Sequence, residues 1–273
     1  MIDFSLVSEA SYFGFFIGIL SVIAVAVSKA GFGGALASLS APIMLIAFTP
    51  TQALGILLPL FLITDVWVVW FWRHLGVRRI IIFMTIAGLL GQLVGWAMLH
   101  FGALDDSMLR LFIGLMAILT ALRYFMTQFG ASKKVQTIRL RARAFRRKIA
   151  SRAFLWCGLS GFTSFVSLTG GIPAQIYLLP LALPRQLFVA TMAWFFLFIN
   201  LAKIPFFADL QIMSAATFTL SALFLPFIPI GIILGRWMNK NLTDRLFYIL
   251  VHFLLLGLGL QLLVRFFIGE TTA

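Results

Sequence analysis

The chain has 273 residues, of which 62% are hydrophobic and only 11% are charged, and its mean hydropathy is +1.07. These values lie outside the range of soluble domains and indicate an integral membrane protein. The long apolar runs predict membrane-spanning helices and exclude the alternating pattern of a transmembrane β-barrel. The net charge of +13 does not indicate nucleic-acid binding, because many of the 21 Lys and Arg residues lie in one connector between apolar segments.

The N-terminal region contains Asp3 and Glu9 where a cleavable signal peptide would have a basic stretch, so we expect the first apolar segment to be retained. Two apolar arms, at about 13–28 and 32–48, are separated by the sequence KAGFGG. Each arm has roughly 12 to 17 residues, fewer than the roughly 20 that cross a bilayer. We therefore predict a broken or re-entrant helical hairpin over about 13–48.

Segments of spanning length follow this hairpin, and the first repeat, 1–126, contains three of them, at about 52–72, 79–99 and 107–126. A basic connector at 127–152 comes next. The second repeat, 153–273, begins with a hairpin at about 153–183, whose arms at 153–166 and 172–183 are separated by SLTGG. Its three predicted spans lie at about 187–207, 213–235 and 245–267.

Charge bias orients these segments, because basic loops stay on the cytoplasmic side. The connector is therefore predicted to be cytoplasmic, where RLRARAFRRKI could form an amphipathic surface helix in contact with anionic lipids. Counting outwards from the connector places both termini outside. We expect a multi-pass protein of a bacterial inner membrane and leave open whether it forms a homo-oligomer.

The two repeats share short sequence matches in the same order. Gly33-Gly34 recurs as Gly170-Gly171, PTQ at 50–52 as PRQ at 184–186, and GQLVG at 91–95 as GIILG at 231–235. Because the first repeat runs from outside to inside and the second from inside to outside, the matches predict an all-α membrane protein with an inverted-topology repeat. Secondary transporters use this arrangement to build a site at the midplane of the membrane.

The glycine pairs indicate an anion site, because a helix that begins beside them would present backbone N–H groups and the positive end of its dipole. Two such ends could converge on one small anion. The alternative for each glycine is close helix packing, and for each hydroxyl a bond to its own helix. The candidate binding residues are Lys29, Gly33, Gly34, Ser38, Thr169, Gly170, Gly171, Gln175, Asn200 and Lys203.

Three charged residues lie within apolar segments. Lys29 could balance an anion or extend its ammonium to the membrane surface. Lys203 precedes Pro205, which could break its helix and turn the ammonium inward, and Asn200 lies one turn away on the same face. Asp65 could carry a coupling proton or pair with Arg73. No metal or cofactor is expected, since Cys157 is the only cysteine and the three histidines are scattered.

Two stretches resemble the motif regions of the sulfite exporter TauE/SafE family: KAGFGGALASLSAP, and GFTSFVSLTGGIPAQIYLLPLALPRQLFVATMAWFFLFINLAKIPFF. The resemblance covers nearly the whole chain and implies movement of sulfite, sulfoacetate or related organosulfonates. Relatives often carry a histidine and a double proline around the second glycine pair, where this chain has Leu168 and Ile172. The family's typical positions here are Lys29, Gly31, Gly33, Gly34, Pro42, Gly170, Gly171, Pro173, Tyr177, Pro180, Asn200, Lys203 and Pro205.

These features favour a non-enzymatic secondary transporter that exports a small sulfur-containing oxyanion by alternating access. The residues indicate an anion, and only the resemblance indicates sulfur. A passive anion channel is an alternative that the sequence does not exclude. A membrane-embedded enzyme acting on lipid phosphates is a further one, but it would need clustered carboxylates, histidines or a metal site, and Asp65 alone does not provide them.

Overall fold

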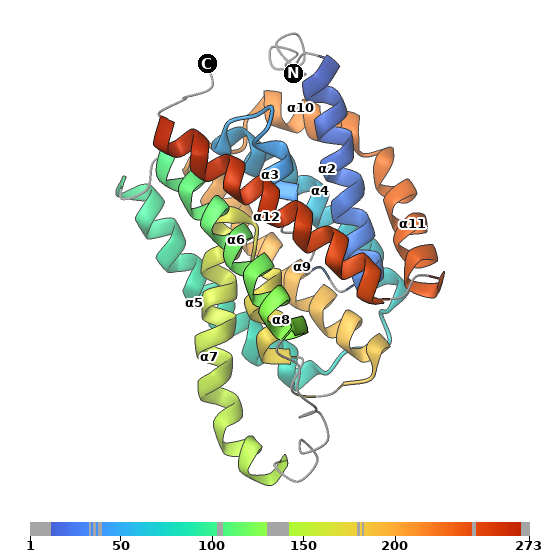
Figure 1. Ribbon diagram of the computed structural model, residues 1–273. Helices are drawn as coiled ribbons and strands as arrows, with labels where there is room; N and C mark the ends of the chain where they lie inside the picture. The colour runs from blue at the N-terminus through green and yellow to red at the C-terminus, as the bar shows by residue number, and fades with distance from the viewer. Residues whose placement is uncertain are drawn as a thin grey trace.

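The computed structural model describes residues 12–32, 34, 37, 40–102, 106–129, 142–178, 181, 183–241 and 244–268, and within them every regular element is a helix (Figure 1). In the region of the predicted first repeat lie α2 (Tyr12–Phe32), α3 (Ser40–Met44), α4 (Pro50–Phe71), α5 (Arg78–His100) and α6 (Asp106–Phe129). Helix α7 (Ala142–Ser167) begins in the connector, and α8 (Gly171–Leu178), α9 (Arg185–Asp209), α10 (Ala215–Phe224), α11 (Phe227–Asn241) and α12 (Asp244–Ile268) follow it.

Four helices of the described chain are long and apolar enough to cross a membrane, and a fifth candidate is the bent pair α10–α11. They confirm a multi-pass membrane protein. The four lie at Tyr12–Gly31, Pro50–Phe71, Arg78–His100 and Leu187–Asp209. Helices α6 and α12 lie at the positions of the two remaining predicted spans.

Two predicted hairpin arms are longer than the sequence suggested. The arm predicted at 13–28 is part of α2, which has 21 residues and continues through Lys29 and Gly31. The arm predicted at 153–166 is part of α7, which has 26 residues and includes the end of the basic connector. Ala, Arg and Lys are strong helix formers, so the basic segment extends the helix. The other arms contain the short helices α3 and α8.

The span predicted at 213–235 is a second correction, because α10 and α11 are separate helices bent by 49°. Pro226 and Pro229 lie at this break and have no N–H to continue the helical hydrogen bonds. By contrast, Pro59 and Pro205 lie inside α4 and α9, which continue past them. The sequence suggested that Pro205 could break its helix, but α9 continues past it.

Helices α4 and α9 pack against each other, and the other helices pair around them: α5 with α7, α11 with α2, and α12 with α6. Glycines make two of these contacts close. An added Cβ at Gly91 of α5 would collide with the backbone of Gly158 in α7, and one at Gly235 of α11 with the backbone of Val27 in α2. The two matched glycine stretches are thus helix-packing surfaces.

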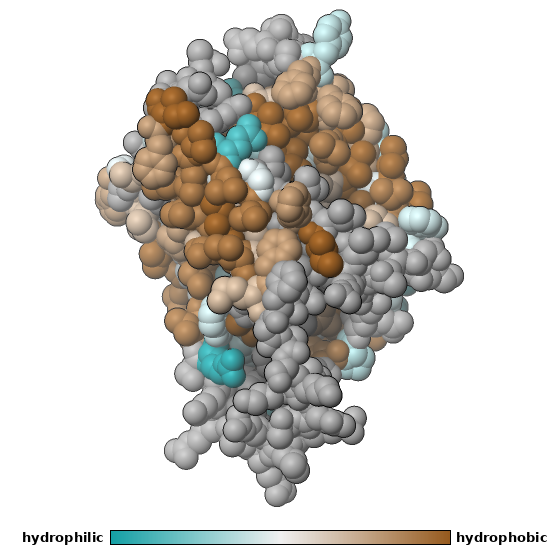
Figure 2. Space-filling view, viewed as in Figure 1, coloured by the Kyte–Doolittle hydropathy of each residue, from teal (hydrophilic) through white to brown (hydrophobic). Residues whose placement is uncertain are grey.

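The outer surface is apolar, as expected for helices that face lipid. On α5, Ile82, Ile86, Leu90 and Val94 recur every four residues, and each is about half exposed. Figure 2 shows apolar side chains over most of the described surface on one face. The polar groups must therefore be sought inside the bundle.

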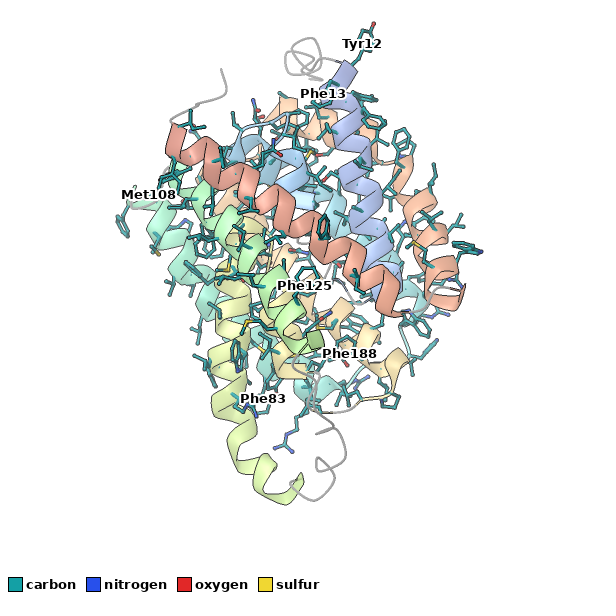
Figure 3. The ribbon with its side chains drawn as sticks, in the orientation of Figure 1. Tyr12, Phe13, Phe83, Met108, Phe125 and Phe188 are labelled. Atoms are coloured by element: carbon teal, nitrogen blue, oxygen red, sulfur yellow. The ribbon has the colours of Figure 1, made fainter. Side chains whose placement is uncertain are left out.

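The first described helix, α2, starts on the side of the bundle where the last one, α12, ends. Figure 1 shows the start of α2 and the end of α12 at the top, whereas α7 begins at the bottom. Figure 3 places Tyr12 and Phe13 at the same upper end. The connector residues 130–141 lie outside the described part of the chain.

Candidate functional site

An ion pair lies in the interior of the bundle, between α2 and α4. The Nζ atom of Lys29 is 2.7 Å from Oδ1 of Asp65 and also donates to the backbone oxygen of Phe61 at 3.3 Å. The same ammonium lies 4.2 Å from the centre of the Phe61 ring. Lys29 is 5% exposed and Asp65 is 1% exposed, so the pair is screened from solvent.

Helix α9 extends this pair into a continuous hydrogen-bonded cluster. Asn200 Nδ2 donates to Oδ2 of Asp65 at 2.7 Å, and its own Oδ1 accepts a bond from Lys203 Nζ at 3.0 Å. Lys203 Nζ also donates to Ser164 Oγ of α7 at 2.8 Å. We call these five residues, Lys29, Asp65, Ser164, Asn200 and Lys203, the buried polar cluster.

The local structure of α9 explains why Lys203 is buried. Asn200 and Lys203 are three residues apart, so both side chains lie on the helix face that meets α4 and α7. Asn200 and Lys203 were predicted to share one face of this helix, and their hydrogen bond confirms it. The alternative pairing of Asp65 with Arg73 is wrong, since Arg73 Nε donates to His74 Nε2 at 3.0 Å.

The cluster contains more positive than negative groups. Lys29 has a carboxylate partner, whereas Lys203 contacts a hydroxyl and an amide oxygen, and no described carboxylate lies within ion-pairing distance of it. With all three groups ionised the cluster carries one net positive charge. Burying such a charge is costly unless an anion balances it.

In the first hairpin, only part of the predicted anion site lies within the described residues. Gly33 and Ser38 lie outside them. Gly34 has a φ of 85°, a backbone conformation that favours glycine. Its N–H donates to the backbone oxygen of Ser28 at 3.1 Å and closes the end of α2. This amide is therefore not one of the free donors that the glycine pair suggested.

In the second hairpin, α8 begins at Gly171, as predicted. The backbone oxygen of Gly170 accepts a bond from Ser160 Oγ at 2.6 Å, and the Thr169 hydroxyl is 2.6 Å from that of Ser167. Gln175 lies partly buried on α8 and is also engaged in contacts. The partners of Gly170 and Thr169 in these bonds, Ser160 and Ser167, both belong to α7. The two hairpins thus contribute to the site through the helices that precede their glycines.

A constant sequence separation relates the polar groups of the two repeats. Lys29 and Ser164, Asp65 and Asn200, and Val68 and Lys203 are each 135 residues apart. The helix ends follow the same spacing, since Thr169 N donates to Thr163 O at 3.3 Å just as Gly34 N donates to Ser28 O. This spacing pairs Gly34 with Thr169, so the glycine pairs matched in the sequence are displaced by two residues.

Sequence reasoning identified Lys29, Asp65, Asn200 and Lys203 but did not join Lys29 to Asp65. The 135-residue spacing was a signal that could have done so, because it relates these two residues to Ser164 and Asn200, which both bond Lys203.

A cavity of about 10 Å³ adjoins Lys29, Gly34 and Asp65. This volume holds about one water molecule, so it is too small for an oxyanion without rearrangement. No three His, Cys, Asp or Glu side chains in the described ranges group closely enough to hold a metal ion.

One comparison with known proteins gives a match. The model of the family described as "Sulfite exporter TauE/SafE" matches residues 15–262, which include every residue of the buried polar cluster. Neither the curated proteins nor the solved structures contain a significant match. A match over nearly the whole chain, together with spanning helices around a buried polar cluster, shows that the chain belongs to the sulfite exporter TauE/SafE family of membrane transport proteins.

Proposed function

We propose that this protein is a secondary transporter that moves a small sulfur-containing oxyanion, either sulfite or an organosulfonate, by alternating access. The observation that carries the proposal is the buried polar cluster, in which Lys203 has no carboxylate partner among the described residues. A desolvated oxyanion would supply the missing charge. Membership of a sulfite exporter family supports sulfur as its central element.

The pairing of helices supports an inverted repeat, in which α2, α4, α5 and α6 correspond to α7, α9, α10–α11 and α12. Exchanging the two sets turns the α5–α7 contact into the α11–α2 contact, and leaves the α4–α9 and α6–α12 contacts in place. Two hydrogen bonds join helices that this exchange relates, α5 to α9 and α10 to α4. Gln92 of α5 donates to the Ile199 oxygen of α9 at 2.9 Å, and Ser221 of α10 donates to the Ile56 oxygen of α4 at 2.8 Å.

Alternating access requires two bodies that move about a common site. The buried polar cluster lies where α2 and α4 of one repeat meet α7 and α9 of the other. A rocking movement of α2 and α4 against α7 and α9 would expose the cluster first to one side of the membrane and then to the other. Side chains of both repeats would line the site throughout this movement.

Asp65 is the candidate coupling residue. When its carboxylate is ionised, it neutralises Lys29 and leaves Lys203 to hold the anion. When it is protonated, both ammonium groups are available, so the site attracts an anion more strongly. A proton and an anion would then bind together. The titratable groups that face Asp65 are Lys29 from α2 and, through Asn200, Lys203 from α9.

We propose export across a bacterial inner membrane, with the basic loops in the cytoplasm and both termini outside. Arg73 follows α4, and Arg78 and Arg79 begin α5, at the end of α4 that follows Asp65. This end would face the cytoplasm and load the anion.

The test is flux of sulfite and of methanesulfonate in liposomes that contain the purified protein. We expect saturable flux, and acceleration of labelled substrate by unlabelled substrate on the opposite side. Flux that neither saturates nor shows this counterflow would identify a channel.

Asp65→Asn should remove the pH dependence of methanesulfonate binding, because the charge of this probe does not change near neutral pH. Unchanged pH dependence would exclude Asp65 as the coupling residue.

A further inference from the structure

A second, larger cavity lies between α2, α4 and α11. Its volume is about 250 Å³, sufficient for a small oxyanion with part of its hydration shell. We call it the Arg236 cavity, and it is lined by Ala30, Val68, Phe71, Trp72, Ile232 and Arg236. Tryptophan and arginine are typical of the boundary between the apolar membrane interior and water.

Arg236 provides the charge of this cavity. Its guanidinium carbon lies 4.8 Å from the centre of the Phe71 ring. No carboxylate within the described ranges forms an ion pair with it. Its planar set of N–H donors matches two oxygens of a sulfonate, sulfite or phosphate group. The chemistry of the cavity is therefore that of an oxyanion site.

Val68 separates the Arg236 cavity from the buried polar cluster. This side chain is 2% exposed and lines both the Arg236 cavity and the smaller cavity that contains Lys29 and Asp65. Ala30, the neighbour of Lys29, lines the larger cavity as well. Only a valine side chain and local packing thus stand between an exposed arginine and the interior ion pair.

The opposite end of the bundle differs at the corresponding positions. With the 135-residue spacing, Ala30, Phe71 and Trp72 correspond to Phe165, Phe206 and Phe207. These phenylalanines are packed together, with the Phe165 ring centre 5.1 Å from that of Phe207 and 6.1 Å from that of Phe206. Trp96, which corresponds to Arg236 in the matched glycine stretches, lies 5.6 Å from Phe206.

The two ends therefore use corresponding positions, but one end is open and the other is closed. At one end the lining side chains, among them Ala30 and Arg236, leave an open cavity, and at the other end four packed aromatic rings occupy the corresponding positions. A transporter open to one side and closed to the other has this asymmetry. The open end is the one beside the basic loop of Arg73, Arg78 and Arg79.

We propose that the Arg236 cavity is the entry site of the transported oxyanion, which binds Arg236 first and then passes Val68 to reach the buried polar cluster. The inference rests on the proposed transport function and adds a second anion site to it. A lipid phosphate has the same chemistry as a free oxyanion, so the experiment must separate the two sources.

The first measurement compares methanesulfonate flux in liposomes of neutral lipid alone and of neutral lipid with an anionic lipid. Arg236→Gln should raise the half-saturating concentration about tenfold, which corresponds to loss of one charge-assisted interaction of about 1.4 kcal/mol. Arg236→Lys should retain part of the affinity. The matched control is Arg79→Gln, which removes an exposed charge from the adjacent loop end and lines neither cavity.

Equal losses for Arg236→Gln in both lipid mixtures would support the entry site. A loss seen only with anionic lipid would assign the cavity to a lipid headgroup and overturn the proposal, as would flux equal to that of the parent. An equal loss in Arg79→Gln would reduce the effect to general surface charge. Absence of flux in the parent protein would instead contradict the proposed function.

A second measurement does not depend on flux. Cys157 is the only cysteine, so Ala30→Cys in a Cys157→Ser background places one thiol in the Arg236 cavity. Methanesulfonate should slow the modification of this thiol by a neutral thiol reagent, and Arg236→Gln should abolish the protection. Protection that persists without Arg236, or no protection at all, would overturn the entry site. Thermal unfolding of each variant confirms that it is folded.

Discussion

The two predicted repeats bring residues 135 positions apart to the buried polar cluster but supply different charges. In the first repeat, Lys29 and Asp65 form an ion pair that is neutral as a unit. In the second, Ser164 and Asn200 occupy the corresponding positions without charge, and Lys203 is placed where the first repeat has Val68. The excess positive charge of the cluster thus comes from Lys203, 135 residues after a position that holds the apolar Val68.

The largest effect should come from breaking the ion pair of the first repeat. Lys29→Gln or Asp65→Asn leaves a buried charge without its partner, which should reduce the free energy of unfolding by about 3–5 kcal/mol. The double variant should be less destabilised than the sum of the two, because neither charge remains. Thermal unfolding of the purified proteins measures this coupling.

The exposed pair of His100 and Asp209 is the matched control, since its side chains are 43% and 47% exposed. Its Nδ1 to Oδ2 distance is 3.2 Å, and removing either partner should cost less than about 1 kcal/mol. Additive effects of Lys29→Gln and Asp65→Asn would show that the interior pair is no more coupled than this one.

The second prediction concerns the added charge of the second repeat. Lys203→Gln should weaken binding of methanesulfonate about 10- to 100-fold, as expected for loss of an interaction of about 1.5–3 kcal/mol with a charged group. Lys203→Arg should be only partly tolerated, because the guanidinium is larger and has a fixed geometry. Calorimetry on folded variants measures the affinity.

Binding by Lys203→Gln as tight as that of the parent would make the ammonium structural, and the anion site would then have to lie around Lys29.

The third prediction compares the two hairpin glycines. A Cβ at Gly170 would lie 2.5 Å from the Ser160 oxygen and from the Ser164 Cβ, so Gly170→Ala should displace Ser164 from Lys203 and cost about 1–3 kcal/mol of stability. At Gly34 the nearest atom is Lys29 Cγ at 3.7 Å, and Gly34→Ala should cost only about 1 kcal/mol for its positive φ. Denaturant unfolding would rank the two, and a larger loss at Gly34 would contradict the packing argument.

The smallest perturbation is a reporter fusion, which tests the orientation of the repeats. Fusions at the two termini should both report an outside location, and one in the connector at 127–152 a cytoplasmic location. Termini on opposite sides of the membrane would exclude the inverted repeat.

Much of the helical fold could be predicted because hydropathy directly reflects burial in lipid. The spans at 52–72, 79–99 and 187–207 coincide with α4, α5 and α9 within a few residues. The length of α2 could not be predicted by this rule, since Lys29 reads as a break unless its partner is known. Asp65 lies 36 residues away and permits the charge inside a continuous helix.

The site was predicted in its residue types but not in its geometry. Lys203 and Asn200 are one turn apart, so helical spacing sufficed to link them. The link from Asn200 to Asp65 spans 135 residues and depends on the packing of α4 against α9. Of the glycines predicted as anion donors, Gly34 has its amide bonded within its own segment, because this N–H closes the end of α2, which the sequence pattern does not reveal.

The break between α10 and α11 has a consequence for hydrogen exchange. At this point Leu225 N donates to both Ser221 O and Ala222 O, and Ile228 N makes a three-residue bond to Leu225 O. Helix α10 is tied to α4 by Ser221, and α11 is tied to α2 by its glycines. The amides of α10 should therefore exchange together with those of α4, and the amides of α11 with those of α2, as two separate cooperative units within one sequence span.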